Sequence, residues 1–349
     1  MIPEIKRRAV PFNPPKRSGR SVPPELWRGF FRGERLACAR LITMIENDTE
    51  AIPDIRDRLI PRLKGAIRIG ITGPPGVGKS TVTASLACRA VQDNHSVGIL
   101  AVDPTSPFTG GAFLGDRIRM QGLGGDHKVF IRSLASREGH GGLSPSTPHA
   151  ADILDAFGMD RIFIETVGVG QAELDVLTCV DLIILVLQPG TGDVIQALKA
   201  GILEAADIVL VNKADLSGTE SLLESLRFVF DINACQKIKP IPQLLAGSAI
   251  RDKGMDNVYG RMEDRIRGLV QSGAHRQKKR ILMEQDIRTA IQQDLWEKFS
   301  RLTKAEKEIP AAAERMIRNR QSPYPYIRRV CSQVKILKTK ERADREKGE

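Results

Sequence analysis

The stretch of sequence that decides the fold is Gly73-Pro74-Pro75-Gly76-Val77-Gly78-Lys79-Ser80. It matches the phosphate-loop pattern G-x-x-x-x-G-K-[ST] at every fixed position. The apolar run 66–72 before it predicts a short buried strand, and the run 81–92 after it has the apolar spacing of a helix. A strand, a glycine loop and a helix in this order predict a backbone that wraps around phosphate groups and points its N–H groups at the anion.

Lys79 and Ser80 supply the side-chain chemistry of this loop. We expect Lys79 to reach the outer phosphates and the Ser80 hydroxyl to ligate Mg²⁺. Thr81 comes next and is expected to contact the nucleotide as well. The alternative is a glycine-rich turn that binds nothing, and the strand and helix on either side of the loop argue against it. The sequence therefore predicts a nucleotide-binding protein.

A second motif follows the apolar run 206–211, where the chain continues Asn212-Lys213-Ala214-Asp215. It matches N-K-x-D, the base-recognition element of GTP-binding proteins. Guanine offers two adjacent donors, N1–H and the 2-amino group, and an ionised Asp215 can accept from both. Adenine lacks this pair and would leave the carboxylate unsatisfied. We expect Asn212 to meet the O6/N7 edge and the stem of Lys213 to cover the base, which makes GTP and GDP the predicted ligands.

Ser248-Ala249 comes after a further apolar run, 240–245. This pair is similar to the last base-contacting loop of GTP-binding proteins. Two residues make a short match by themselves. Their position after the N-K-x-D motif is the reason for assigning them to the base-contacting loop. We therefore expect Ser248 and Ala249 to complete the site for the base.

Three acidic residues are placed where phosphoryl transfer needs charge neutralisation. Asp103 ends the apolar run 97–102, and Glu165 ends the run 161–164. The carboxyl ends of strands in an open parallel sheet face its ligand crevice, so both should approach Mg²⁺ and the phosphates. Asp116 is a third candidate for contact with the metal or with water. For each of them the alternative is an ordinary helix-cap or turn acid.

Gly168 and Gln171 lie in the segment that follows Glu165. A glycine lets the backbone approach a ligand closely, so the N–H of Gly168 is suited to contact the γ-phosphate. Gln171 either orients a water molecule or holds a switch loop by a hydrogen bond. The sequence leaves these two roles open.

Taken together, these motifs resemble the MeaB/ArgK/MMAA group of GTPases. That group contains the G-protein chaperones of adenosylcobalamin-dependent acyl-CoA mutases, typically methylmalonyl-CoA mutase. The resemblance runs from about Leu36 to Phe299, and the segment 165–171 is nearly diagnostic for the group. Its motifs lie at Gly73–Thr81, Ala101–Pro104, Gly110–Gly111, Leu114–Asp116, Arg119–Met120, Glu165–Gln171 and Asn212–Leu216.

The resemblance implies a slow GTPase that gates cofactor loading and protects its mutase from inactivation. It also implies that residues 188–199 form a mobile segment, similar to the third switch of the family, which couples the nucleotide state to the partner. A plain strand-to-helix turn is the alternative for that segment. The residues that the resemblance assigns to phosphate, Mg²⁺ and catalysis are Lys79, Ser80, Asp103, Asp116 and Glu165. Those that it assigns to guanine are Asn212, Lys213 and Asp215.

Strand-like runs alternate with helical segments over residues 66–260. Such alternation predicts an α/β fold with a doubly wound, mostly parallel sheet, here a P-loop NTPase domain with helical extensions at both ends. Residues 1–24 are expected to form a disordered basic arm, and residues 25–65 an N-terminal helical segment. Residues 261–349 are expected to form a C-terminal helical arm with a basic tail. Members of the group dimerise through this region, so we expect a homodimer.

The chain has 349 residues and a formal net charge of +11, which raises the question of nucleic acid. The basic excess lies outside residues 68–258, aromatic residues make up only 5%, and no nucleic-acid-reading module is recognisable. The five cysteines have no C-x-x-C spacing, which suits a reducing cytosol. No run approaches a membrane span or a secretory signal. The sequence predicts a cytoplasmic protein that binds neither membrane nor nucleic acid.

Two other functions remain open at this point, and salt-dependent retention of RNA would add a third, that of a nucleic-acid-binding GTPase. A metallochaperone GTPase for another metalloenzyme, such as a nickel enzyme, shares this α/β build. It requires a Cys or His pair near the switches or a histidine-rich arm, and the sequence shows neither. A small-molecule or protein kinase needs an acceptor pocket and usually ATP, and Asp215 argues against ATP.

Overall fold

The computed structural model describes residues 22–47, 51–104, 127–136, 146–166, 179–190, 202–235, 241–303 and 305–332. Its strands in these ranges are β1 (Ile67–Thr72), β2 (Val97–Pro104), β3 (Val129–Ser136), β4 (Arg161–Glu165), β5 (Leu182–Leu187), β6 (Ile208–Val211) and β7 (Gln243–Ala246). Its helices are α1 (Pro24–Phe31), α2 (Arg35–Asn47), α3 (Ile52–Leu59), η2 (Ile60–Arg62), α4 (Lys79–Gln92), α6 (Thr147–Phe157), α9 (Ile202–Ala205), α10 (Thr219–Cys235), α11 (Met255–Gln271), α12 (Ala274–Thr303) and α13 (Ala305–Asn319).

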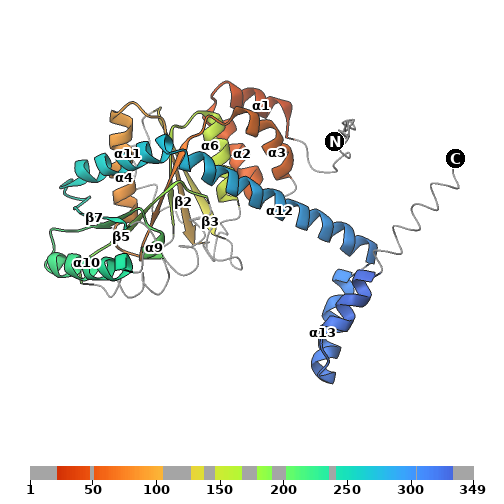
Figure 1. The fold of residues 1–349 in the computed structure, drawn as a ribbon. Coiled ribbons are helices and arrows are strands. Elements are labelled where there is room, and N and C mark those ends of the chain that lie inside the picture. Colours follow the sequence, from red (N-terminus) through yellow and green to blue (C-terminus); the bar gives the residue numbers. More distant parts are fainter. Residues whose placement is uncertain are drawn as a thin grey trace, which may run out of the picture. The chain divides into compact units, whose positions relative to one another are not determined.

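The strands form one parallel sheet of seven strands in the order β3-β2-β4-β1-β5-β6-β7 (Figure 1). β1 lies between β4 and β5, with Ile69 opposite Phe163 on one side and opposite Leu182 on the other. Each neighbouring pair is parallel. Parallel neighbours need crossover connections, which the helices between them provide. The doubly wound α/β fold expected from the sequence is confirmed.

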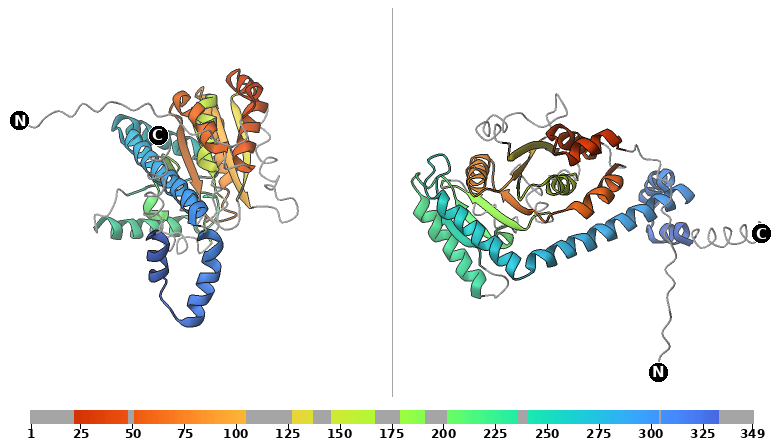
Figure 2. Two further views of the ribbon diagram at one scale, coloured as in Figure 1. Left: turned by 90° about the vertical axis from the view of Figure 1, so that its right-hand side faces the viewer. Right: turned by 90° about the horizontal axis from the view of Figure 1, so that it is seen from above.

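Helices cover both faces of this sheet (Figure 2). On one face, Ile69 and Ile71 of β1 pack with Val82 and Leu86 of α4, and Met262 of α11 belongs to the same core. These five side chains are completely buried. Helix α4 is therefore fixed to the sheet directly behind the glycine loop, and α11 is fixed to α4.

The opposite face is covered by α6, α10 and the N-terminal helices. Leu100 of β2 and Leu185 of β5 share a core with Ile153 of α6, Leu226 of α10 and Leu41 of α2. Strands that are buried on both faces read as continuous apolar runs, which is why 182–187 is entirely aliphatic. The expected N-terminal helical segment thus takes part in the main core.

Strand β7 was not predicted from the sequence, although residues 240–245 were noted before the Ser248-Ala249 pair. It pairs with β6 at the sheet edge, with Gln243 opposite Ile208 and Ala246 opposite Val211. All four of its residues are only half-buried, and prolines stand at 240 and 242 just before it. Prolines and partial burial are typical of an edge strand. Because β7 leads into Gly247 and Ser248, its pairing fixes where the base loop begins.

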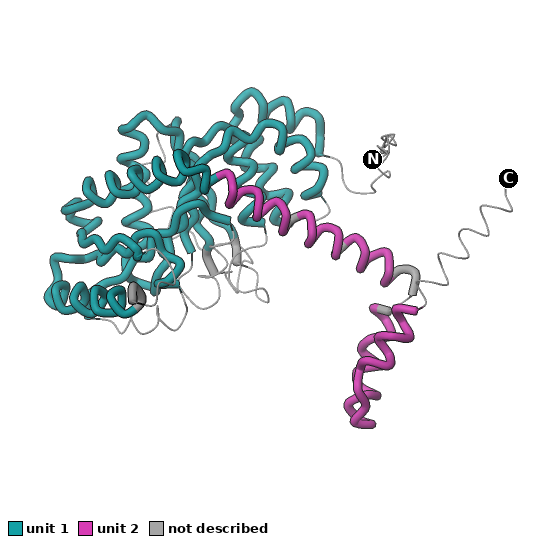
Figure 3. Tube along the Cα trace, viewed as in Figure 1, with its two compact units in different colours: residues 1–275 teal, residues 276–349 magenta. Residues whose placement is uncertain are grey.

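The chain divides into two compact units, residues 1–275 and residues 276–349 (Figure 3). The sheet and the helices that cover it belong to the first unit. The second contains most of α12, all of α13 and a helical stretch at 324–332. Within the described part of the chain, no helix combines the length and the apolarity that crossing a bilayer requires.

Candidate nucleotide-binding site

The loop between β1 and α4 has a backbone that requires glycine. Gly73, Gly76 and Gly78 have φ angles of +141°, +80° and +94°. A Cβ on Gly73 would lie 2.1 Å from the carbonyl oxygen of Val186 on β5. Left-handed angles and this close approach exclude other residues. The loop therefore lies against the carboxyl end of the sheet and leads directly into the first turn of α4.

Lys79 is folded back over this loop and is only 7% exposed. Its Nζ donates hydrogen bonds to the carbonyl oxygens of Gly73 at 2.8 Å and Pro74 at 3.0 Å. A buried ammonium group is costly unless it is hydrogen-bonded and balanced by a negative charge. The loop, the lysine and the amino end of α4 together suit a bound polyanion.

Glu165 lies at the carboxyl end of β4, directly beneath the start of α4. Its Oε1 accepts a hydrogen bond of 2.6 Å from the Ser80 hydroxyl, and its Oε2 accepts one of 3.2 Å from the Thr83 hydroxyl. Glu165 is 4% exposed, so these contacts are buried. Oxygen atoms of a hydroxyl and a carboxylate are the ligands that Mg²⁺ prefers, and their chemistry fits that cation.

Thr83 did not stand out in the sequence, although it lies four residues after Lys79 on one face of α4. Besides its contact with Glu165, its hydroxyl lies 2.9 Å from the carbonyl oxygen of Lys79. Next to Glu165, the Thr166 hydroxyl donates to the Thr72 hydroxyl at 3.1 Å. The Thr72–Thr166 contact joins the ends of β1 and β4, and the contact of Thr83 with Glu165 joins α4 to β4.

Asp103 is the second-to-last residue of β2. It lies two residues beyond Ala101, which pairs with Glu165 of β4. Its backbone therefore lies at the same edge of the sheet as the glutamate. Asp116, Gly168 and Gln171 fall outside the described residues. So does most of the expected switch segment, of which the structure describes 188–190.

Asn212 follows β6 and is 2% exposed. Its Nδ2 donates to the carbonyl oxygen of Val77 at 2.8 Å, and its Oδ1 accepts from the N–H of Ala249 at 3.0 Å. A Cβ on Gly78 would come within 2.6 Å of this Nδ2. The asparagine therefore joins the phosphate loop to the Ser248-Ala249 pair, a link that no spacing in the sequence predicted.

Lys213 and Asp215 occupy the turn after Asn212. Lys213 has a φ of +56°, and its Nζ donates to the carbonyl oxygen of Gly76 at 2.7 Å. Its stem thus bridges the turn and the phosphate loop. Asp215 is paired with Arg251, whose Nε lies 2.8 Å from Oδ2. Lys213 therefore contacts the phosphate loop, and Asp215 contacts the loop around residue 250.

The pKa of Asp215 lies below its ordinary value. The Ser248 hydroxyl is the main cause, and the positive charge of Arg251 adds to it. The hydroxyl lies near the carboxylate without the geometry of a full hydrogen bond. Both residues favour the ionised form of Asp215. Arg251 was not foreseen from the sequence, because one arginine in a loop has no pattern around it.

The site thus combines a glycine loop over a buried lysine, a hydroxyl–carboxylate pair for a hard cation and an ionised aspartate two strands away. On a parallel sheet with this topology, these features define the class of P-loop GTPases. A family model described as methylmalonyl-CoA mutase-associated GTPase MeaB matches residues 38–304. The chain belongs to this family, and GTP hydrolysis is its activity.

Relatives support the same assignment. A putative GTPase of Pyrococcus abyssi is 42% identical over 269 residues, which cover 76% of this chain and 83% of the relative. The GTPase ArgK of Escherichia coli is 33% identical over 256 residues, or 69% of this chain and 75% of ArgK. The crystal structure of the LAO/AO transport system kinase has a TM-score of 0.64 and covers 89% of this chain and 97% of its own. At 22% identity, that likeness shows the fold alone.

Proposed function

We propose that this GTPase is a chaperone of an adenosylcobalamin-dependent acyl-CoA mutase of the methylmalonyl-CoA mutase type. It would bind and hydrolyse GTP to gate the loading of cobalamin into the mutase and to protect the loaded enzyme. The observation that carries the proposal is the family match over residues 38–304, because the family's description links the GTPase to that mutase.

The phosphate end of the site has the groups that this role requires. Lys79 would exchange its two carbonyl partners for the outer phosphates, since a charged acceptor forms a stronger hydrogen bond with it than a carbonyl does. Ser80 and Glu165 would hold Mg²⁺, with Asp103 and Asp116 as further contacts. The cation would supply charge neutralisation at the phosphates. Gly168 would contact the γ-phosphate through its N–H.

The base end would select guanine. The lowered pKa of Asp215 favours its ionised form. Asn212 and Lys213, in the same stretch of chain, are hydrogen-bonded to the phosphate loop. A base bound by Asp215 would therefore lie at a fixed distance from its phosphates. We assign the base to Asn212, Lys213, Asp215, Ser248 and Ala249. Residues 188–199, expected to act as a switch, would then couple the nucleotide state to the partner.

Affinity capture tests this proposal. Full-length Glu165→Gln should keep GTP bound with slower turnover, and Lys79→Ala should not retain nucleotide. We expect GTP-loaded Glu165→Gln to recover subunits of an acyl-CoA mutase from a lysate of the source cells and Lys79→Ala to recover none. Recovery of nickel enzymes or RNA in place of a mutase would contradict the proposed role. Normal GTP turnover by both variants would show that the site residues are assigned wrongly.

A further inference from the structure

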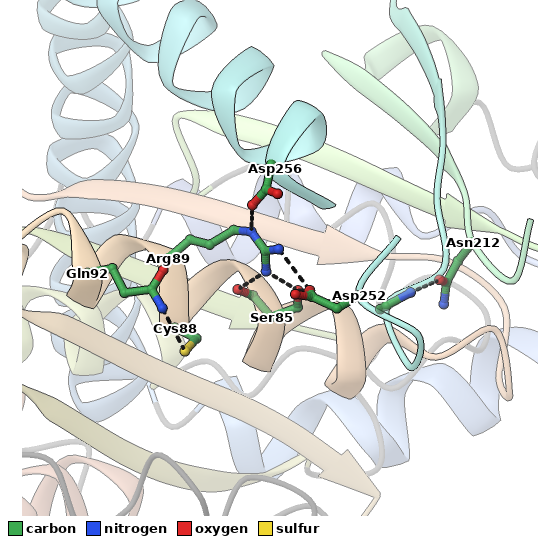
Figure 4. Close-up of polar contacts among 8 residues, drawn as sticks. Ser85, Cys88, Arg89, Gln92, Asn212, Asp252 and Asp256 are labelled. Atoms are coloured by element: carbon green, nitrogen blue, oxygen red, sulfur yellow. Dashed lines mark hydrogen bonds and ion pairs between the residues drawn. The ribbon is translucent and has the colours of Figure 1, made fainter. Parts of the chain in front are cut away.

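Arg89 lies ten residues beyond Lys79 on α4 and reaches away from the phosphate loop toward the start of α11 (Figure 4). Its Nε donates to Asp256 Oδ1 at 2.8 Å, and its Nη2 donates to Asp252 Oδ1 at 2.8 Å. Its Nη1 donates to the Ser85 hydroxyl, also at 2.8 Å. The arginine side chain is 11% exposed, whereas Asp252 and Asp256 are 67% and 91% exposed. One planar guanidinium group thus holds two carboxylates from either side of residue 254.

These carboxylates belong to the segment 248–256, which begins with the proposed base contacts. Ser248 and Lys253 exchange main-chain hydrogen bonds of 2.9 and 3.1 Å, so the loop between them is a closed turn. Asp252 has a φ of +53°, a left-handed conformation that a non-glycine residue adopts at some cost. The turn therefore requires contacts from outside it. Arg89 makes the shorter side-chain contact with Asp252, and the Ser85 hydroxyl lies 3.5 Å from the same Oδ1.

Residues of this turn contact two of the proposed base-binding residues, Asn212 and Asp215. Ala249 donates its N–H to Asn212, and Arg251 pairs with Asp215. Asn212 in turn donates to Val77 in the phosphate loop, which runs straight into α4. The contacts form a closed circuit from α4 through Arg89, the turn and Asn212 back to the start of α4. A displacement of the turn would move the partners of Asn212 and Asp215 together.

We infer that Arg89 is a positioning residue for base selectivity, which keeps the 248–253 turn where Asp215 meets the 2-amino group of guanine. This inference rests on the proposed guanine site. Arg89 itself touches neither the base nor the phosphates; it acts through Asp252 and the turn. Because the two carboxylates are exposed, each ion pair is weak by itself. The proposed effect on base selectivity therefore arises from geometry, since the planar guanidinium group of Arg89 fixes the positions of Asp252 and Asp256 together.

Inosine diphosphate is the probe, because it differs from GDP only by the missing 2-amino group. We expect wild-type protein to bind GDP more tightly than the inosine nucleotide, as measured by calorimetry on the full chain. Arg89→Met should reduce that preference roughly fivefold, about the value of one hydrogen bond. Asp252→Asn should act in the same direction, and the double variant should lose no more than Arg89→Met alone.

Arg267→Met is the matched control, since Arg267 lies on α11 and pairs with Asp264 at an exposed position away from the turn. It should leave the preference unchanged. If Arg89→Met weakens both nucleotides by the same factor, the arginine only supports the fold and the inference is wrong. If wild-type protein binds ADP as well as GDP, the proposed guanine site fails instead, and the two failures are distinguishable.

Discussion

At the scale of single residues, the proposed selectivity for guanine depends on the charge of Asp215. The Ser248 hydroxyl and Arg251 lower the pKa of its carboxyl. A lowered pKa keeps the group ionised at every pH above that pKa, and the contact is lost only when the pH falls through it. Guanine recognition by Asp215 should therefore survive acidification beyond the point at which an ordinary aspartate becomes protonated.

Asp215→Asn tests this contact directly. The asparagine replaces one acceptor with an N–H donor, which suits the 2-carbonyl group of xanthine and opposes the 2-amino group of guanine. We expect affinity for GTP to fall about 10- to 100-fold and affinity for xanthosine triphosphate to rise, as measured by competition binding. Glu224→Gln on α10 removes an exposed charge and serves as the control. Unchanged preference for GTP would exclude Asp215 from the base site.

At the scale of elements, a buried arginine joins β1 to α6 at the amino end of the sheet. Arg68 donates to Asp152 Oδ1 at 2.7 Å, and both side chains are 11% exposed. Its main-chain N–H donates to Asp181 Oδ2 at 2.9 Å, and Asp181 also contacts His275. Burial disfavours the charge of Arg68, but Asp152, with smaller contributions from Asp181 and Cys179, more than compensates, so the pKa of Arg68 is raised. The pair thus fixes α6 behind the strand that leads into the phosphate loop.

Arg68→Met should destabilise the first compact unit. The substitution leaves the carboxylate of Asp152 with Arg56, at 3.5 Å, as its remaining cation. The loss should therefore lie at the low end of the about 3–5 kcal/mol that breaking a buried pair costs. Urea unfolding followed by circular dichroism would measure the loss. Arg28→Met breaks an exposed pair with Glu25 and should change stability by no more than about 0.5 kcal/mol. Equal effects of the two variants would mean that the buried pair does not stabilise the fold.

At the scale of the whole molecule, the second compact unit exposes an apolar stripe. Ile287, Ile291 and Leu295 recur at helical spacing on α12 and are 51%, 54% and 60% exposed. Contiguous apolar surface of this kind marks interaction sites. We propose that the stripe contributes to a homodimer, in line with the expectation for the C-terminal arm.

Sedimentation of the full chain tests the dimer. We expect wild-type protein to have the mass of two chains at micromolar concentration and Ile287→Glu with Ile291→Glu to shift it toward one chain, because the charges would be buried in the interface. GTP hydrolysis should persist in that variant, since the site lies in the first unit. Gln292→Glu, an exposed polar position on the same helix, should keep the dimer. A wild-type chain that is monomeric at all concentrations would contradict the proposal.

Much of this architecture could be predicted from local patterns. The apolar runs before Gly73 and before Asn212 are strands, and the run 81–92 is a helix, because burial on both faces or on one stripe leaves a readable periodicity. The ends of strands were harder to place: β2 extends to Pro104, beyond the apolar run 97–102. Edge strand β7 was missed because half-buried residues beside prolines have no such signal.

The sequence by itself determined the chemical groups of this protein: a glycine loop with lysine and serine, an acid after a strand and an aspartate suited to guanine. These depend on residue type and short spacing. Only the tertiary structure decided how they are held, as in the contacts of Glu165 with Thr83 and of Arg89 with Asp252. Arg89 and Asp252 are 163 residues apart, and only the packing of α11 on α4 brings them together. Contacts at such separation leave no local periodicity, because they are set by the arrangement of whole elements around the sheet.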